Sequence, residues 1–235
     1  MTDLVKHVIW SLNQANTFQH RLPQEIIEIN GMSGWKTRTF YNALCSLDRP
    51  LEYFEVGAWK GSTLCSAIYG NPKVHATVID NWSEFDGPFK EFTDNIKKFG
   101  LKDRVDVLYE DFNKFIGSKR LTKPVDIYLY DGDHSFESHR MAITNMWDIL
   151  AEKAIVIVDD WNALQVCRGT MEGFKDVNAN IVEKFEICYT SDGSHTPKEM
   201  AGQEFWNGIG VFVIDKRITN CKCNECECTQ CSCRV

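Results

Sequence analysis

The chain has 235 residues, 43% of them hydrophobic, and a formal net charge of −7 at pH 7. This length and hydrophobic content are sufficient for one large domain with its own core. The sequence has no apolar run long enough to cross a membrane, and its first residues lack the basic and then apolar pattern of a signal peptide. We therefore expect a cytoplasmic protein. The negative charge and the lack of a basic stripe argue against a nucleic-acid partner.

Periodicity divides the chain into three parts. Residues 1–50 show helical patterns at 3–19 and 36–47 and predict an N-terminal helical cap. Residues 51–217 alternate between β-branched apolar runs and helical segments, which predicts a doubly wound, Rossmann-like α/β domain. Residues 218–235 form a tail that is rich in cysteine.

Seven apolar runs in the central part are candidate strands. The first five are continuously apolar, as expected for parallel strands that are covered on both faces. The last two follow each other without a clear helix, so we expect them to end a mostly parallel sheet as an antiparallel pair. The candidate strands are 51–56, 75–79, 105–109, 126–130, 154–158, 185–189 and 210–214, and the helical segments are 63–69, 89–99, 113–116, 134–150 and 163–177.

A glycine-containing turn follows the first candidate strand and is the most informative motif. Gly57 and Gly61 allow a tight turn with room for a ligand, and Ser62 and Thr63 begin the next helix. A dinucleotide site would need a third glycine, and its pyrophosphate would be repelled by Glu55. Glu55 would instead attract an ammonium group. An ordinary strand–helix turn is the simpler alternative.

This turn resembles motif I of the class I S-adenosylmethionine (SAM)-dependent methyltransferases. The resemblance implies that Glu55, Gly57, Gly61, Ser62 and Thr63 bind SAM, and that the seven strands form the class I methyltransferase fold. In such enzymes an N-terminal addition covers the substrate side or joins two copies of the chain, so the cap either has one of these roles or simply packs on the core.

Acidic and aromatic residues follow the second and third candidate strands. Asp80 lies about 20 residues after the glycine turn, where a carboxylate suits the two ribose hydroxyls of a nucleoside; the alternative is a turn or cap residue. Trp82 would stack on the adenine or cover it, or belong to the core. Asp111 lies in the region that contacts adenine by resemblance, although Glu110 competes for that role and a plain loop is an alternative.

Two acidic clusters follow the fourth and fifth candidate strands. Asp131, Asp133 and His134 follow the fourth strand, and Asp159 and Asp160 follow the fifth. Neighbouring parallel strands lie about 4.8 Å apart, so these clusters can converge. Carboxylates in one small volume repel each other, and a divalent cation such as Mg²⁺, Mn²⁺ or Ca²⁺ relieves that repulsion. The alternative is that these residues only cap turns and helices.

The two acidic clusters resemble those of the Mg²⁺-dependent O-methyltransferases that act on antibiotic sugars, such as the macrocin and mycinamicin enzymes, and of their uncharacterised relatives. The resemblance covers roughly residues 50–162. It implies that Asp131, Asp159 and Asp160 hold the metal, with Asp131 also near SAM, and that Asp133 or His134 is the catalytic base. We thus expect methylation of a hydroxyl on a sugar or other small molecule. The alternatives are another nucleotide-binding enzyme, such as an oxidoreductase, or a non-catalytic metal-handling protein.

The tail repeats cysteine with a period of five residues. Six thiolates in this spacing suit Zn²⁺ or Cu⁺, while a reduced tail or disulfides are the alternatives. The candidate ligands are Cys221, Cys223, Cys226, Cys228, Cys231 and Cys233.

Overall fold

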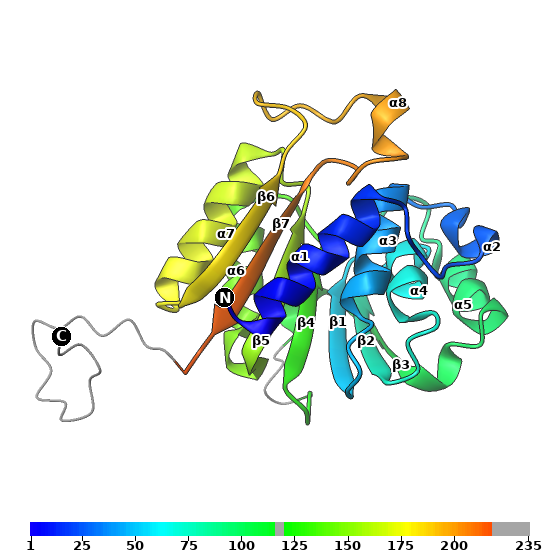
Figure 1. Ribbon diagram of the computed structural model, residues 1–235, viewed down its shortest axis with the longest axis horizontal. Helices are drawn as coiled ribbons and strands as arrows, with labels where there is room; N and C mark the ends of the chain where they lie inside the picture. Colours follow the sequence, from blue (N-terminus) through cyan, green and yellow to red (C-terminus); the bar gives the residue numbers. More distant parts are fainter. Residues whose placement is uncertain (116–119, 218–235) are drawn as a thin grey trace, which may run out of the picture.

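The computed structural model describes residues 1–115 and 120–217, so the six cysteines of the tail lie outside the described residues. The described chain forms a seven-stranded sheet between two layers of helices (Figure 1). The strands are β1 (Leu51–Val56), β2 (Val74–Asp80), β3 (Val105–Tyr109), β4 (Val125–Tyr130), β5 (Leu150–Asp159), β6 (Ile181–Ile187) and β7 (Ile209–Asp215). The α-helices are α1 (Asp3–Asn16), α2 (Gln24–Ile27), α3 (Trp35–Leu44), α4 (Ser62–Ile68), α5 (Phe89–Lys98), α6 (Phe136–Met146), α7 (Leu164–Asp176) and α8 (Lys198–Ala201), with short 3-10 turns η1 (Lys102–Arg104), η2 (Phe112–Lys114) and η4 (Trp147–Ile149).

The strand order is β3-β2-β1-β4-β5-β7-β6. Strands β1 to β5 are parallel to one another, and β7 is antiparallel to both β5 and β6. This arrangement confirms the predicted seven-stranded, mostly parallel sheet with an antiparallel ending. It is the class I methyltransferase fold.

Alternation along each strand creates two cores, one on each face of the sheet. Tyr53 packs into a core with α1 to α5, whereas its neighbour Phe54 packs into a second core with α6 and α7. Successive side chains of a strand point to opposite faces, so an apolar run fills both cores at once. This is why the continuously apolar runs were reliable signals of the central strands.

The N-terminal residues share the first core with the sheet. Val5 and Val8 of α1 and Phe40 of α3 belong to the same buried cluster as Tyr53 of β1. Figure 1 shows α1 lying across the sheet on the face opposite α6 and α7. Residues 1–50 are therefore built into the core of the sheet domain.

Several predicted boundaries differ from the observed ones. The helix predicted at 134–150 begins at Phe136, because Ser135 accepts a hydrogen bond from the N–H of Ser138 as its N-cap, and ends at Met146. Strand β5 begins at Leu150, and β6 begins four residues before its predicted start at 185. Among the described residues, no helix is long and apolar enough to cross a membrane.

Candidate functional site

The site lies where the chain reverses its direction of winding across the sheet. Strands β1 and β4 are neighbours, but α4 packs on one face after β1 and α6 packs on the other face after β4. Ligands of open α/β sheets bind at such a point, beyond the carboxyl ends of the strands. The glycine turn and the acidic clusters meet here.

Gly57 allows the two strand ends to touch. Its φ angle is +84°, and a Cβ atom at this position would lie 1.7 Å from the carbonyl oxygen of Asp131. The N–H of Asp131 donates to the carbonyl of Val56 at 3.0 Å. A side chain would therefore push the β4 end away from the turn.

We expect Gly57→Ala to destabilise the fold by about 2–4 kcal/mol, because it combines backbone strain with a backbone clash. Gly100→Ala is the matched control, since Gly100 also has a positive φ, +67°, but its Cβ would meet nothing within 4 Å. The control should lose about 1 kcal/mol. Urea denaturation measures both values, and equal losses would contradict the proposed clash.

Glu55 lies beneath the first turn of α4. Its carboxylate is fully buried and accepts hydrogen bonds from the hydroxyl groups of Tyr53, at 2.7 Å, and Thr63, at 2.6 Å. Glu55 therefore supports the turn from below by holding the Thr63 side chain. Burial raises the pKa of Glu55 to about 7.

The raised pKa predicts a pH-dependent stability. The folded protein holds the proton of Glu55 more tightly than the unfolded chain does. This stabilisation is therefore complete below the ordinary glutamate pKa of 4.5 and is lost as the pH rises through about 7. Relative to Glu55→Gln, the wild-type protein should lose up to about 3 kcal/mol between mildly acidic and mildly basic pH. Denaturation of both proteins at the two pH values measures this, and a constant difference would contradict it.

Asp80 organises the two turns that flank the end of β2. Its Oδ2 accepts from the N–H of Trp59 at 2.9 Å, and its Oδ1 accepts from the N–H of Trp82 at 2.7 Å. Both tryptophans have left-handed backbones, with φ of 43° and 46°. The predicted ribose acid therefore also holds the glycine turn against the β2 end.

Trp82 and Asp111 have the structural roles that the sequence left as alternatives. The Trp82 ring is only 4% exposed and packs against Phe89 and Phe92, so it belongs to the core and does not offer an open face for adenine stacking. Asp111 accepts the N–H of Asn113 at 2.9 Å as the cap of η2. This is the loop role that the sequence left as an alternative.

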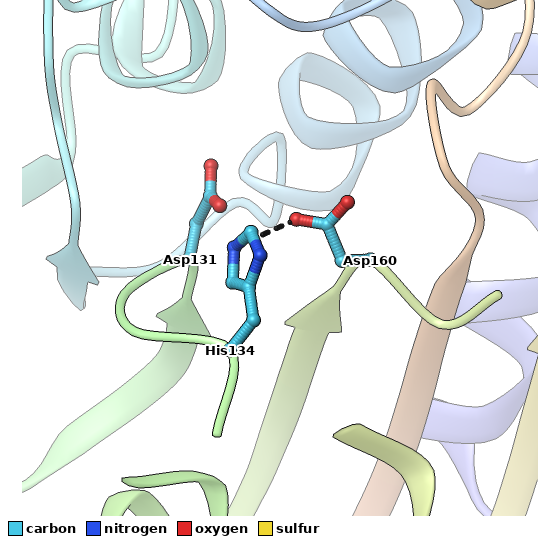
Figure 2. A group of neighbouring side chains, drawn as sticks. All are labelled: Asp131, His134 and Asp160. Carbon is cyan, nitrogen blue, oxygen red and sulfur yellow. Dashed lines mark ion pairs between the residues drawn. The ribbon is translucent and has the colours of Figure 1, made fainter. Parts of the chain in front are cut away.

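The two acidic clusters converge, and the group whose ligand atoms meet contains Asp131, His134 and Asp160 but not Asp159. Figure 2 shows Asp131 after the end of β4, Asp160 after the end of β5, and His134 reaching between them. One ligand atom from each of the three lies within 4.8 Å of the other two. His134 Nε2 is 2.9 Å from Asp160 Oδ2. The structure therefore adds His134 to the residues that could hold or face a cation.

Crowding of the acids changes their titration. Burial, and then the charge of Asp160, raises the pKa of Asp131 to about 8. Burial and the charge of Asp131 also raise the pKa of Asp159. Burial would raise the pKa of Asp160 too, but the hydrogen bond and charge of His134 lower it. The hydrogen bond to Asp160 raises the pKa of His134 to about 9.

Asp133 is held by the turn that starts α6. Its carboxylate is exposed and accepts the N–H of Ser135 at 3.0 Å. Hydrogen bonds from Ser135 and Ser138 lower the pKa of Asp133 to about 2. It is a weak proton acceptor that stabilises the start of α6.

Two residues near Asp160 had no signal in the sequence. Asn207 donates to Asp160 Oδ1 at 2.6 Å, and its amide nitrogen lies 2.9 Å from His195 Nδ1. The antiparallel register explains the approach, because Asp159 pairs with Ile209 and so places Asn207 beside Asp160. The strand order must be known before this contact can be predicted.

Two buried oxygens near the acids lack partners. Asp159 Oδ1 and the hydroxyl of Tyr41 make no hydrogen bond within the described chain. Burial, and then the charge of Asp159, raises the pKa of Tyr41. Unsatisfied buried oxygens are rare. The free carboxylate oxygen of Asp159 and the carboxylates of Asp131 and Asp160 are hard oxygen donors of the kind that fits Mg²⁺, Mn²⁺ or Ca²⁺.

The protein resembles known proteins in part of its sequence and in its fold. Residues 54–161, from β1 to just past β5, match the family model of a methyltransferase domain. No curated protein matches the sequence significantly.

Solved methyltransferases share the fold at low sequence identity. The O-methyltransferase TomG of Streptomyces achromogenes, involved in tomaymycin synthesis and solved with SAM, has a TM-score of 0.63 at 9% identity, covering 92% of this chain and 100% of its own. An O-methyltransferase of Bacillus cereus in complex with SAH (S-adenosylhomocysteine) has a TM-score of 0.56 at 12% identity, covering 92% of each chain. The SAH-bound methyltransferase PaMTH1 of Podospora anserina has a TM-score of 0.54 at 12% identity, covering 90% and 88%.

Proposed function

We propose that the protein transfers a methyl group from SAM to a hydroxyl of a small molecule or sugar, with the assistance of a divalent cation. The observation that carries the proposal is the meeting of Asp131, His134 and Asp160 beside the glycine turn of a methyltransferase domain. SAM bound in TomG, and SAH bound in two other proteins of this fold, support the choice of methyl donor.

SAM would lie between the glycine turn and the β2 end. Gly57 and Gly61 leave the turn free of side chains, and Asp80 would receive the ribose hydroxyls with the lone pairs that Trp59 and Trp82 leave free. The exposed ring of Tyr109, which packs 5.2 Å from the ring of Trp82, offers the adenine the face that Trp82 itself does not.

Asp131, Asp159 and Asp160 would hold the cation. When bound, a divalent cation lowers the pKa of an acceptor hydroxyl and fixes its position. The crowded carboxylates would then remain ionised together, because the cation offsets their mutual repulsion. Asn207 would keep Asp160 oriented through its 2.6 Å hydrogen bond.

His134 is the better placed of the two candidate bases. Its ring lies between Asp131 and Asp160, whereas Asp133 is held by the turn that starts α6. The acceptor hydroxyl would give its proton to the neutral form of His134, which the charge of a bound cation would favour by lowering the pKa of the ring. The acceptor oxygen would attack the methyl carbon of SAM so that SAH leaves. Alignment of oxygen, methyl carbon and sulfur would provide most of the acceleration.

A screen of methyl transfer tests this function. Purified protein, SAM with a labelled methyl group and Mg²⁺ are incubated with a panel of sugars, polyols and phenols, and label in the acceptor is measured. We expect transfer to at least one hydroxyl acceptor, with loss of transfer in EDTA and in His134→Ala. Transfer that is undiminished in EDTA would contradict the role of the cation, and transfer exclusively to nitrogen acceptors would contradict O-methylation.

A further inference from the structure

Arg38 on α3 is a buried charge without an acidic partner. Arg38 is only 3% exposed, and its guanidinium group makes no ion pair with any carboxylate in residues 1–115 or 120–217. Nε and Nη1 donate to the backbone oxygens of Ser33, Ile26 and Ile27 and to the Ser33 hydroxyl. Burial lowers the pKa of Arg38 to about 10. Such burial is costly unless something compensates the charge.

The remaining guanidinium nitrogen faces the glycine turn. Nη2 of Arg38 makes no hydrogen bond within the part of the chain that the structure describes. A Cβ atom on Gly31 would lie 3.2 Å from this nitrogen and 2.1 Å from Ser62 Oγ. Ser62 Oγ is also 3.0 Å from the Ser33 hydroxyl. Arg38 and Ser62 thus meet at the first turn of α4.

The buried carboxyl group of Glu55 contacts the same turn. Glu55 contacts Thr63, the residue after Ser62, and it too has no ionic partner in the described chain. The thiol of Cys65, one turn further along α4, feels both charges: burial and Glu55 raise its pKa, and Arg38 lowers it. The first turn of α4 is therefore flanked by a buried acid that is hydrogen-bonded within the chain and by a buried base that lacks an acidic partner in the described residues.

We propose that Arg38 and Ser62 bind the carboxylate of the amino-acid part of the methyl donor. The inference rests on the proposed function, because it presumes that SAM occupies the glycine turn. A carboxylate here would supply the counter-charge that Arg38 lacks and accept a bond from Nη2. It also gives residues 1–50 a role in cofactor binding, since α3 belongs to that segment.

Two ligands that differ in this group test the inference. SAH carries the amino-acid part, whereas 5′-methylthioadenosine retains the nucleoside but lacks it. Arg38→Met should weaken SAH binding by about 10–100-fold, as expected for a lost charge-assisted bond, and should leave methylthioadenosine binding within a factor of about three. Ser62→Ala should weaken SAH alone, by about fivefold.

The outcomes separate this inference from the proposed function. An equal loss for both ligands in Arg38→Met, or SAH binding unchanged in Ser62→Ala, would overturn the carboxylate site and assign Arg38 a packing role. If Arg38→Met fails to fold, Ser62→Ala decides. A wild-type protein that binds neither ligand would overturn the cofactor assignment, and this inference with it. Calorimetry on the full chain measures all the affinities.

Discussion

Asp160→Asn is expected to weaken Mn²⁺ binding by at least about 30-fold and to reduce methyl transfer by about 100-fold or more. The substitution preserves size and removes one of the converging charges. Asp160 also holds two neighbouring side chains. Its Oδ1 accepts a hydrogen bond from Asn207 at 2.6 Å, and its Oδ2 lies 2.9 Å from His134 Nε2. Titration calorimetry with Mn²⁺ measures the affinity.

Asp111→Asn is the control for this prediction. Asp111 also follows a strand of the parallel sheet, but its carboxylate caps η2 by accepting from Asn113. Its replacement should leave Mn²⁺ affinity unchanged within a factor of about two, since a charge screened by solvent contributes little. Equal weakening by the two variants would mean that general negative charge, and not a site at Asp160, attracts the cation.

Asp80→Asn is expected to weaken SAH binding by about 10–100-fold. The variant loses a charged acceptor for ribose hydroxyls, and the amide must also satisfy the N–H groups of Trp59 and Trp82. Asp86→Asn is the matched control, because Asp86 lies in the same loop, is exposed and has a left-handed backbone that asparagine tolerates. Fluorescence titration with SAH measures both variants.

The result for Asp80→Asn also depends on folding. If its loss of SAH affinity is accompanied by an equal loss of methylthioadenosine affinity and an unchanged melting temperature, Asp80 acts on the nucleoside. SAH affinity equal to that of the wild-type protein would contradict the ribose role and leave Asp80 as the residue that holds the two turns together.

Local patterns were sufficient for the centre of the sheet and for the acids. Strand β1 has the predicted bounds. A continuous apolar run is typical of a parallel strand that is covered on both faces, and the glycine that follows it marks where the strand ends. Asp131 and Asp160 could be brought together in prediction because parallel neighbours end at one edge of the sheet. Both inferences use only local sequence patterns and the general rule that neighbouring parallel strands end at the same edge of the sheet.

Contacts that depend on strand order could not be predicted in this way. Asn207 contacts Asp160 because β7 lies antiparallel beside β5. The charge of Asp159 raises the pKa of Tyr41, although Tyr41 lies on α3 in the N-terminal segment. Burial was also invisible in the sequence: Glu55 was expected to face a ligand directly, but it lies beneath α4 and is satisfied by Tyr53 and Thr63. Sequence position alone does not distinguish a ligand contact from a buried support.

Calorimetric titration of the full chain with SAH, with and without Mg²⁺, tests the central claim most directly, with NADH as the comparison ligand. The proposed function predicts one SAH site per chain, no heat from NADH, and a separate Mg²⁺ site that Asp160→Asn removes while SAH still binds. Binding of NADH without binding of SAH would contradict the assignment of this fold to methyl transfer in this protein.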